Sequence, residues 1–246
     1  MKLILLGTSG YHPTDTRHTA CLLVPEVGVM LDAGTAVYRA GRLLQTDTLD
    51  IFLTHAHLDH VIGLTYLFSV LAEHKLARVT VHGLIEKLVA IELHLFSEEL
   101  FPARPPLEMR PLTGDVALGG GGRLRHVPLA HQGGSLAFRL EWPGHCLAYV
   151  TDTVADPAAD YVDFLRGVDL LVHECYFDDA ESQWAERVGH SHTTPVAEVA
   201  RAAGVGRLVL THVNPLVSGI DAAALATARA IFPNTVVGED LMELDF

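Results

Sequence analysis

The sequence predicts an α/β fold, in which short buried strands alternate with amphipathic helices. The first observation behind this prediction is that five apolar runs each end in His, Asp or Glu. The second is the helical periodicity of residues 62–74 and 84–100, together with an Ala-rich segment at 222–231. In α/β folds ligands gather at the carboxyl ends of the strands, so we expect these polar residues to meet at one rim.

The composition indicates a globular chain with a sizeable core. Of its 246 residues, 49% are hydrophobic and 19% are charged, and we expect residues 1–246 to form a single domain. The glycine run at 119–122 predicts a tight turn before a strand at 124–130, and is too short to separate domains. Residues 101–106 are rich in proline and predict an irregular loop.

The N-terminal segment and the cysteines predict a cytoplasmic protein. The segment Met1–Gly7 is typical of a first strand and lacks the longer apolar region and cleavage site of a signal peptide. The apolar runs stop short of a membrane span, so we expect no membrane partner. Three cysteines without paired spacing (Cys21, Cys146 and Cys175) favour a reducing compartment.

The net charge of −13 argues against a nucleic-acid partner. Proteins that follow a phosphate backbone need clustered Lys and Arg, and here the arginines are scattered. We therefore expect a small-molecule substrate. An anionic one remains compatible with the charge, because bound metal ions would cancel part of it locally.

Taken in chain order, each strand end supplies candidate ligands. The five pairs of strand and following residue are Ile51–Thr54 with His55, Val127–Ala130 with His131, Cys146–Thr151 with Asp152, Leu170–Val172 with His173 and Glu174, and Leu208–Thr211 with His212. Strands must end somewhere, and one or two polar endings would be coincidence. Five endings of this type indicate a metal site.

The segment 55–60 carries the densest set of ligands. On an extended chain His55 and His57 point to the same side, and a helix that begins near Asp59 would project Asp59 and His60 from its first turn. Imidazole nitrogen and carboxylate oxygen are the usual ligands of zinc and similar metals. One metal rarely needs four ligands so close together, whereas two adjacent metals do.

These motifs resemble the five motifs of the metallo-β-lactamase superfamily. The opening strand, the turn at 17–19 and the segment 31–34 also resemble its first strands. Within the superfamily, His173-Glu174 and Gly189-His190-Ser191 are most similar to ribonuclease Z and its short phosphodiesterase relatives. The resemblance implies a four-layer αβ/βα sandwich with a dinuclear site along one edge of its two sheets.

The resemblance also implies a role for each ligand. One metal is expected on His55, His57 and His131, the second on Asp59, His60 and His212, with Asp152 bridging both. Two divalent ions, Zn²⁺ or alternatively Mn²⁺, would hold a bridging hydroxide for hydrolysis.

Further residues are assigned to the surroundings of the metals. Asp59 is expected to orient the hydroxide, and Asp32 to hold a ligand imidazole by its free N–H. Glu174 and His190 are expected to protonate the leaving oxygen. His192 competes with His190 for that role, just before a helix predicted to have Thr194 as N-cap, Pro195 at its first position and Gly204 at its end.

One departure from ribonuclease Z bears on the substrate. The long arm that binds tRNA would lie between His131 and Asp152, where this chain has a short hairpin through residues 142–144. The favoured function is therefore a phosphodiesterase acting on a small or cyclic phosphodiester. The alternatives are a lactonase, an aryl-sulfatase-like hydrolase, a tRNA 3′-processing endonuclease and a non-catalytic metal-binding module.

The oligomeric state is also left open. A homodimer is one prediction, suggested by the apolar stripe Leu64, Leu67, Phe68 and Leu71. Core packing explains the same stripe equally well.

Overall fold

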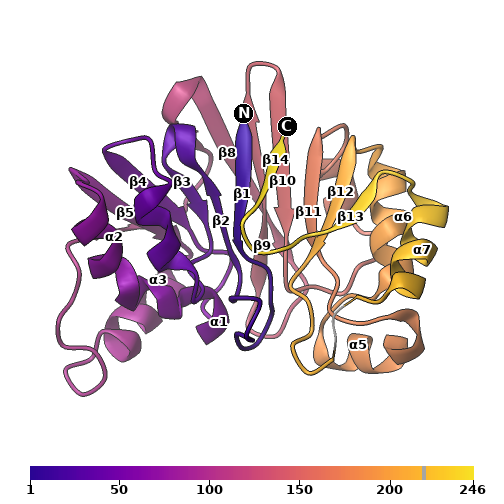
Figure 1. The fold of residues 1–246 in the computed structure, drawn as a ribbon, viewed down its shortest axis with the longest axis horizontal. Coiled ribbons are helices and arrows are strands. Elements are labelled where there is room, and N and C mark those ends of the chain that lie inside the picture. Colours follow the sequence, from indigo (N-terminus) through magenta and orange to yellow (C-terminus); the bar gives the residue numbers. More distant parts are fainter. Residues whose placement is uncertain (218–219) are drawn as a thin grey trace. The chain divides into compact units, whose positions relative to one another are not determined.

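The structure is a computed structural model that describes residues 1–217 and 220–246. The chain forms two compact units (Figure 1). The first contains residues 1–120 and 240–245, and the second contains residues 121–239 and Phe246. The last strand, β14, pairs with β1, so the chain returns to its first unit at the end. Whether residues 1–246 unfold as a single domain stays a prediction.

The first unit is built on a mixed sheet. Its strands lie in the order β14 (Met242–Asp245), β1 (Lys2–Gly7), β2 (Cys21–Val24), β3 (Val29–Leu31), β4 (Thr48–Phe52), β5 (Arg78–Gly83) and β6 (Glu108–Pro111). A further short strand in this part of the chain is β7 (Val116–Leu118). Strands β3 to β6 are parallel, which brings the residues after β3 and β4 to the same edge.

Short helical segments cover one face of this sheet (Figure 1). They are η1 (Pro25–Val27), η2 (Val37–Arg42), α1 (Leu58–Val61), η3 (Ile62–Tyr66), α2 (Leu67–Glu73), α3 (Ile85–Ala90) and the π-helix η4 (Ile91–Leu95). Leu64 and Leu67 are fully buried in the core beneath them, and Leu71 packs against it. The apolar stripe is therefore mainly core, although Phe68 is partly exposed, and the homodimer stays a prediction.

Both helices predicted from periodicity in this unit differ in detail. The one expected over 62–74 starts as a 3₁₀ turn and becomes α-helical at Leu67. The one expected over 84–100 changes to π-helix at Ile91 and ends at Leu95. A separate turn follows, in which the carbonyl of Ser97 accepts the backbone N–H groups of Leu100 and Phe101. The irregular loop expected after it is confirmed.

The second unit is built on a second sheet. From β13 to β8, the strands of this sheet lie in the order β13 (Thr235–Val237), β12 (Arg207–Thr211), β11 (Leu170–Glu174), β10 (His145–Val150), β9 (Ser135–Trp142) and β8 (Gly122–Leu129). The glycine turn before β8 is the short segment η5 (Gly119–Gly121), and β9 and β10 form the short hairpin expected at 142–144. Strands β10, β11 and β12 are parallel, so their carboxyl ends share one edge.

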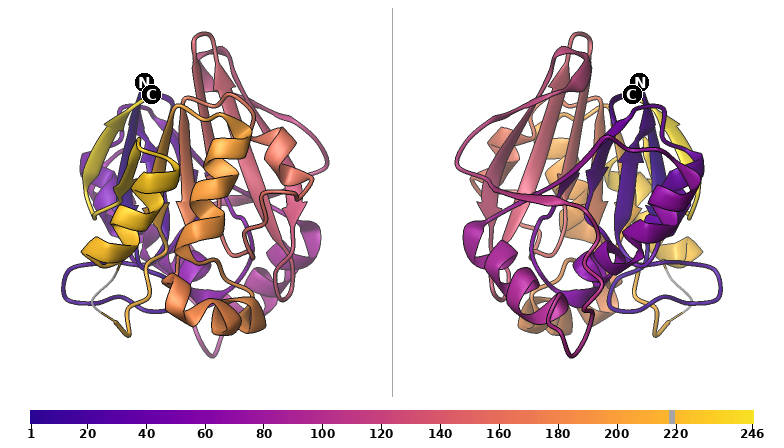
Figure 2. Two further views of the ribbon diagram at one scale, coloured as in Figure 1. Left: turned by 90° about the vertical axis from the view of Figure 1, so that its right-hand side faces the viewer. Right: turned by 90° about the vertical axis from the view of Figure 1, so that its left-hand side faces the viewer.

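Helices also cover this sheet, as Figure 2 shows for α6 and α7. They are α4 (Tyr161–Phe164), η6 (Asp179–Glu181), α5 (Ser182–Val188), α6 (Thr193–Ala203) and α7 (Ala222–Ile231). The Ala-rich helix at 222–231 is confirmed. Within the described ranges 1–217 and 220–246, no helix has the length and apolar character needed to cross a membrane.

The start of α6 corrects one prediction. Its N-cap is His192 and not Thr194, and its first helical residue is Thr193 and not Pro195. Thr194 and Pro195 both lie in the first turn. The carboxylate of Asp179 accepts hydrogen bonds from the backbone N–H and the hydroxyl of Thr194, at 2.8 and 2.6 Å. A distant residue thus satisfies the helix terminus, a task that Thr194 was expected to perform. The helix ends at Gly204 as predicted, with left-handed φ of 61°.

Candidate metal-binding site

In the first unit, the ligand-rich segment connects β4 to α1. His57 is the N-cap of α1 with extended backbone, and Asp59 and His60 lie in the first turn, as predicted. The rings of His55 and His57 lie 4.5 Å apart between centroids. His55 and His60 are buried, whereas His57 is exposed.

Asp32 orients two of these imidazoles. Its carboxylate accepts from Nδ1 of His60 at 2.8 Å and from the backbone N–H of Thr54 at 2.8 Å. The Thr54 hydroxyl also donates to Asp32 and lies 3.0 Å from Nδ1 of His55, so it accepts the His55 proton. With both protons held at Nδ1, the lone pairs of His55 and His60 are at Nε2. The expected role of Asp32 therefore agrees with its contacts.

Asp59 is oriented from the opposite side. Its Oδ2 accepts the backbone N–H of Tyr11 at 2.8 Å and lies 3.4 Å from Nε2 of His60. Tyr11 has φ of 58°, a left-handed conformation that is uncommon for a non-glycine residue. Nothing in the sequence indicated that the loop at 10–16 would supply this backbone donor.

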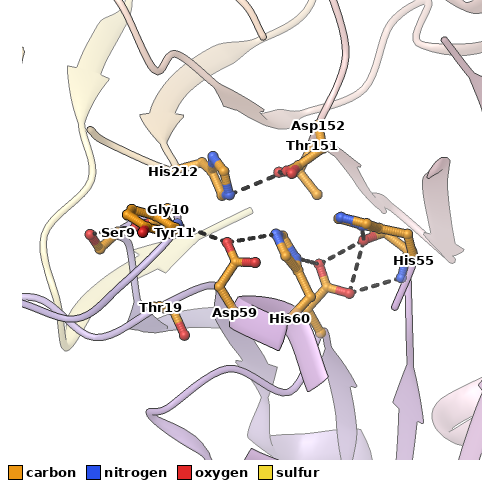
Figure 3. A network of polar contacts seen from close by, with 12 residues as sticks. Ser9, Gly10, Tyr11, Thr19, His55, Asp59, His60, Thr151, Asp152 and His212 are labelled. Carbon is orange, nitrogen blue, oxygen red and sulfur yellow. Dashed lines mark hydrogen bonds and ion pairs between the residues drawn. The ribbon is translucent and has the colours of Figure 1, made fainter. Parts of the chain in front are cut away.

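In the second unit, Asp152 lies between two imidazoles. Its Oδ2 is 3.6 Å from Nε2 of His131, and its Oδ1 is 3.3 Å from Nε2 of His212. Nδ1 of His131 donates to the carbonyl of Gly189 at 3.0 Å, which leaves the lone pair at Nε2. The Thr151 hydroxyl donates to Oδ1 at 2.6 Å (Figure 3). Each carboxylate oxygen therefore faces a different histidine, as a carboxylate that bridges two cations requires.

The backbone is strained at three of these positions. Asp32, Asp152 and His212 have φ of 57°, 53° and 54°. Asp32 and His212 lie directly after β3 and β12, and Asp152 is the second residue after β10. Such left-handed conformations of non-glycine residues cost about 1–3 kcal/mol and cluster at functional sites. The sequence carries no signal for them, because Asp and His are compatible with many conformations.

Glu174 and His190 are in contact. The buried carboxylate of Glu174 accepts from the backbone N–H of Thr153 at 2.7 Å and from that of Ser191 at 3.2 Å. It also lies 3.2 and 3.3 Å from Nδ1 of His190. One ring nitrogen of His190 is within 4.8 Å of the ligand atoms of Asp152 and His212.

His190 is held in place by a neighbouring ring, whereas His192 has a different partner. The ring of Tyr176 stacks on His190, with centroids 4.8 Å apart and 18° between the planes. Nδ1 of His192 instead contacts Asp179 at 2.6 Å, beside the start of α6. Hydrogen bonds from Thr194 and His192 hold the pKa of Asp179 below its usual value, although burial opposes this. Of the two histidines, His190 is the one that meets Glu174.

The donor set fits divalent metal ions. The first unit contributes three imidazoles and one carboxylate, from His55, His57, His60 and Asp59. The second unit contributes two imidazoles and one carboxylate, from His131, His212 and Asp152. The hydrogen bonds of His55, His60 and His131 place the ring proton at Nδ1, so the lone pair that a metal ion would bind lies at Nε2.

Comparison with known proteins identifies the family. Residues 28–213 match the family described as "Beta-lactamase superfamily domain". A Ribonuclease Z of Bradyrhizobium sp. (strain ORS 278) is 30% identical over 303 positions, which cover 99% of each chain. A Ribonuclease Z of Synechococcus sp. (strain WH7803) is 28% identical over 313 positions, covering 100% of this chain and 96% of the relative. Because 313 positions exceed the 246 residues of this chain, that relative contains insertions that this chain lacks.

Solved structures with 17–18% identity share the fold. The metallo-β-lactamase fold protein YhfI from Bacillus subtilis has a TM-score of 0.78 over 99% of both chains. Zn²⁺-bound PqqB from Methylobacterium extorquens gives 0.76 over 100% of both. A diphosphatase from the PhnP family gives 0.75 over 100% of this chain and 96% of the other. These likenesses confirm the predicted αβ/βα fold class, and the chain belongs to the beta-lactamase superfamily domain family as a hydrolase with a candidate His/Asp metal-binding set.

Proposed function

We propose that this chain is a metal-dependent phosphodiesterase that hydrolyses a small or cyclic phosphodiester. The observation that carries the proposal is Asp152, whose two oxygens face Nε2 atoms of His131 and His212. A carboxylate in this position suits two cations, and two-metal sites are typical of enzymes that displace a group from phosphorus. The names of the relatives, Ribonuclease Z and a PhnP-family diphosphatase, favour phosphorus chemistry for this chain too.

The proposed metal ligands follow the family resemblance. We assign His55, His57 and His131 to one ion, Asp59, His60 and His212 to the other, and Asp152 to both. Zn²⁺ is the first choice, since a relative with the same fold is Zn²⁺-bound, and Mn²⁺ suits the same donors. When bound, such ions polarise the phosphoryl oxygens and make water acidic enough to attack at neutral pH.

Three side chains, those of Asp59, His190 and Glu174, act on the attacking water and on the leaving oxygen. Asp59, oriented by the N–H of Tyr11, is positioned to orient the attacking water. His190 donates a proton to the leaving oxygen from Nε2, while its Nδ1 donates to the carboxylate of Glu174. The carboxylate of Glu174 accepts two backbone N–H groups and lies against Nδ1 of His190, where it would stabilise the protonated ring.

The short hairpin between β9 and β10 favours a small substrate. It occupies the place where tRNA-processing relatives are expected to carry an arm, and the chain has a net charge of −13. Precursor tRNA is the second candidate substrate, because the aligned relatives are named Ribonuclease Z.

The test is a substrate panel on metal-loaded protein. We expect turnover of bis-nitrophenyl phosphate and of a cyclic nucleoside phosphodiester, abolished in Asp152→Asn and unaffected by Asp163→Asn, an exposed carboxylate in α4. Precursor tRNA, a lactone and an aryl sulfate complete the panel. Turnover of the lactone or the sulfate without any phosphodiester would reject the proposal.

A further inference from the structure

An apolar pocket in the first unit lies beside the ligand-rich segment. Its volume is about 190 Å³, and its lining consists of Ala56, Leu58, Val61, Ala90, Ile91, His94, Leu95 and Leu100. Ala56 and Leu58 flank His57 in the chain, so one wall of the pocket is continuous with the proposed ligands. Among the residues that the structure describes, this lining includes no Lys, Arg, Asp or Glu.

The opposite wall is built by an unusual backbone. Ile91, His94 and Leu95 belong to the π-helix η4. π-Helical turns are rare in proteins, and those that occur are often found at functional sites. Leu58 and Leu100 are 67% and 72% exposed, which places two large apolar side chains at the pocket in contact with water. Exposed apolar groups that gather around a cavity are typical of a ligand-binding surface.

The wall that carries Leu100 is preformed. Arg104 contacts Glu92 of the π-helix at 3.1 Å, and the rings of Phe96 and Phe101 lie 6.2 Å apart. Backbone bonds to the carbonyl of Ser97 close the turn before Phe101. A pocket with fixed walls loses little entropy when it takes a ligand.

We propose that this pocket binds the apolar ester group that remains on phosphorus, and that the preferred substrates are aryl or branched-alkyl phosphodiesters. The inference rests on the proposed phosphodiesterase activity. Because the leaving oxygen is assigned to His190, the pocket is assigned to the other ester group. A dry cavity of about 150 Å³ is enough for benzene, so 190 Å³ accommodates a phenyl ring. In the reaction, water adds to phosphorus, the bond to the leaving oxygen breaks, and an aryl phosphate monoester remains.

The test compares two substrates with the same leaving group, phenyl nitrophenyl phosphate and methyl nitrophenyl phosphate. We expect the parent to prefer the phenyl ester in kcat/KM by about tenfold or more, the value of burying an aromatic ring. Leu100→Asp, which puts a charge in the pocket, and Ala90→Phe, which fills it, should each remove most of that preference. The metal content of both variants should stay near the parent's.

Leu93→Asp is the matched control. Leu93 lies on the same π-helix and is 62% exposed, but it is outside the lining, so its substitution should leave the preference unchanged. An active parent whose preference is the same in Leu100→Asp, Ala90→Phe and Leu93→Asp would overturn the pocket assignment and leave the phosphodiesterase proposal standing.

A second measurement separates the pocket from the activity. Phenol is titrated while the methyl NMR signals of Ile91 and Leu95 are followed, which requires no turnover. Saturable shifts that disappear in Ala90→Phe would support the aryl pocket even if neither phosphodiester were hydrolysed, a result that would reject the proposed activity alone. Absence of shifts in the parent would overturn the pocket.

Discussion

Replacement of His190 by Ala should separate leaving-group chemistry from metal chemistry. Nδ1 of His190 lies 3.2 and 3.3 Å from the two oxygens of Glu174, and Tyr176 stacks on the ring. The substitution removes the proposed proton donor and leaves Glu174 with its two backbone donors. An alkoxide leaves poorly without a proton, whereas nitrophenolate departs readily as an anion. The loss should therefore depend on the leaving group.

The magnitude follows from general-acid catalysis, which contributes about 10²–10⁴-fold. The contacts of His190 with Glu174 exceed 3 Å, longer than strong charge-assisted bonds, so we expect the lower end, about a hundredfold, for an alkyl phosphodiester. The value of kcat/KM for bis-nitrophenyl phosphate should fall by less than about tenfold. Glu174→Gln should give the same pattern more weakly, and Asp59→Ala should impair both substrates.

The assay is kcat/KM for both substrates at matched metal content. His192→Ala is the control, because His192 contacts Asp179 and not Glu174, and Asp179 still binds Thr194 at the start of α6. Equal losses on both substrates in His190→Ala would refute the acid role. If His192→Ala instead lost activity only on the alkyl phosphodiester, His192 would be the general acid. The contact of His190 with Glu174 would then not identify the proton donor.

Four further outcomes test the rest. Elemental analysis after gentle reconstitution should give two metals per chain, and fewer than two in Asp152→Ala; one metal in the parent would contradict the two-ion assignment. Asp32→Ala should weaken metal affinity about 10–100-fold by releasing His60, measured by competition with a chelator, and an unchanged affinity would deny Asp32 that role. Burial lowers the pKa of His173, so the unfolded chain binds the extra proton as pH falls through about 6.5, and stability to urea should decrease there; His173→Gln should reduce that slope, and an identical slope would assign it to other groups. Calorimetry should show one unfolding transition for residues 1–246, and two separate transitions would contradict the single-domain prediction.

Much of the candidate site could be predicted from the sequence, because its ligands are local features of the chain. Each follows a short apolar run, and parallel strands bring such ends to a common edge within each unit, as β10, β11 and β12 do. The spacing of His55, His57, Asp59 and His60 was equally informative, since α1 begins where the pattern placed a helix.

Other features depend on residues far apart in the chain. Asp32 and His60 are 28 residues apart, and His131 and the carbonyl of Gly189 are 58 apart, yet these contacts decide which ring nitrogen carries the proton. Thr194 has the chemistry of an N-cap, but Asp179, 15 residues earlier, satisfies that terminus. Local preference favoured Thr194, and a tertiary contact overrode it.

The sequence by itself thus determined the fold class and the family, and it supplied the candidate ligands, because strand periodicity and residue type are read residue by residue. The tertiary structure decided the tautomers, the pairing of His190 with Glu174, the left-handed backbone at Asp152 and His212, and the π-helix that shapes the apolar pocket. The physical reason is that hydrogen-bond partners, backbone strain and cavities arise from packing between distant segments, for which a single sequence carries no periodic signal.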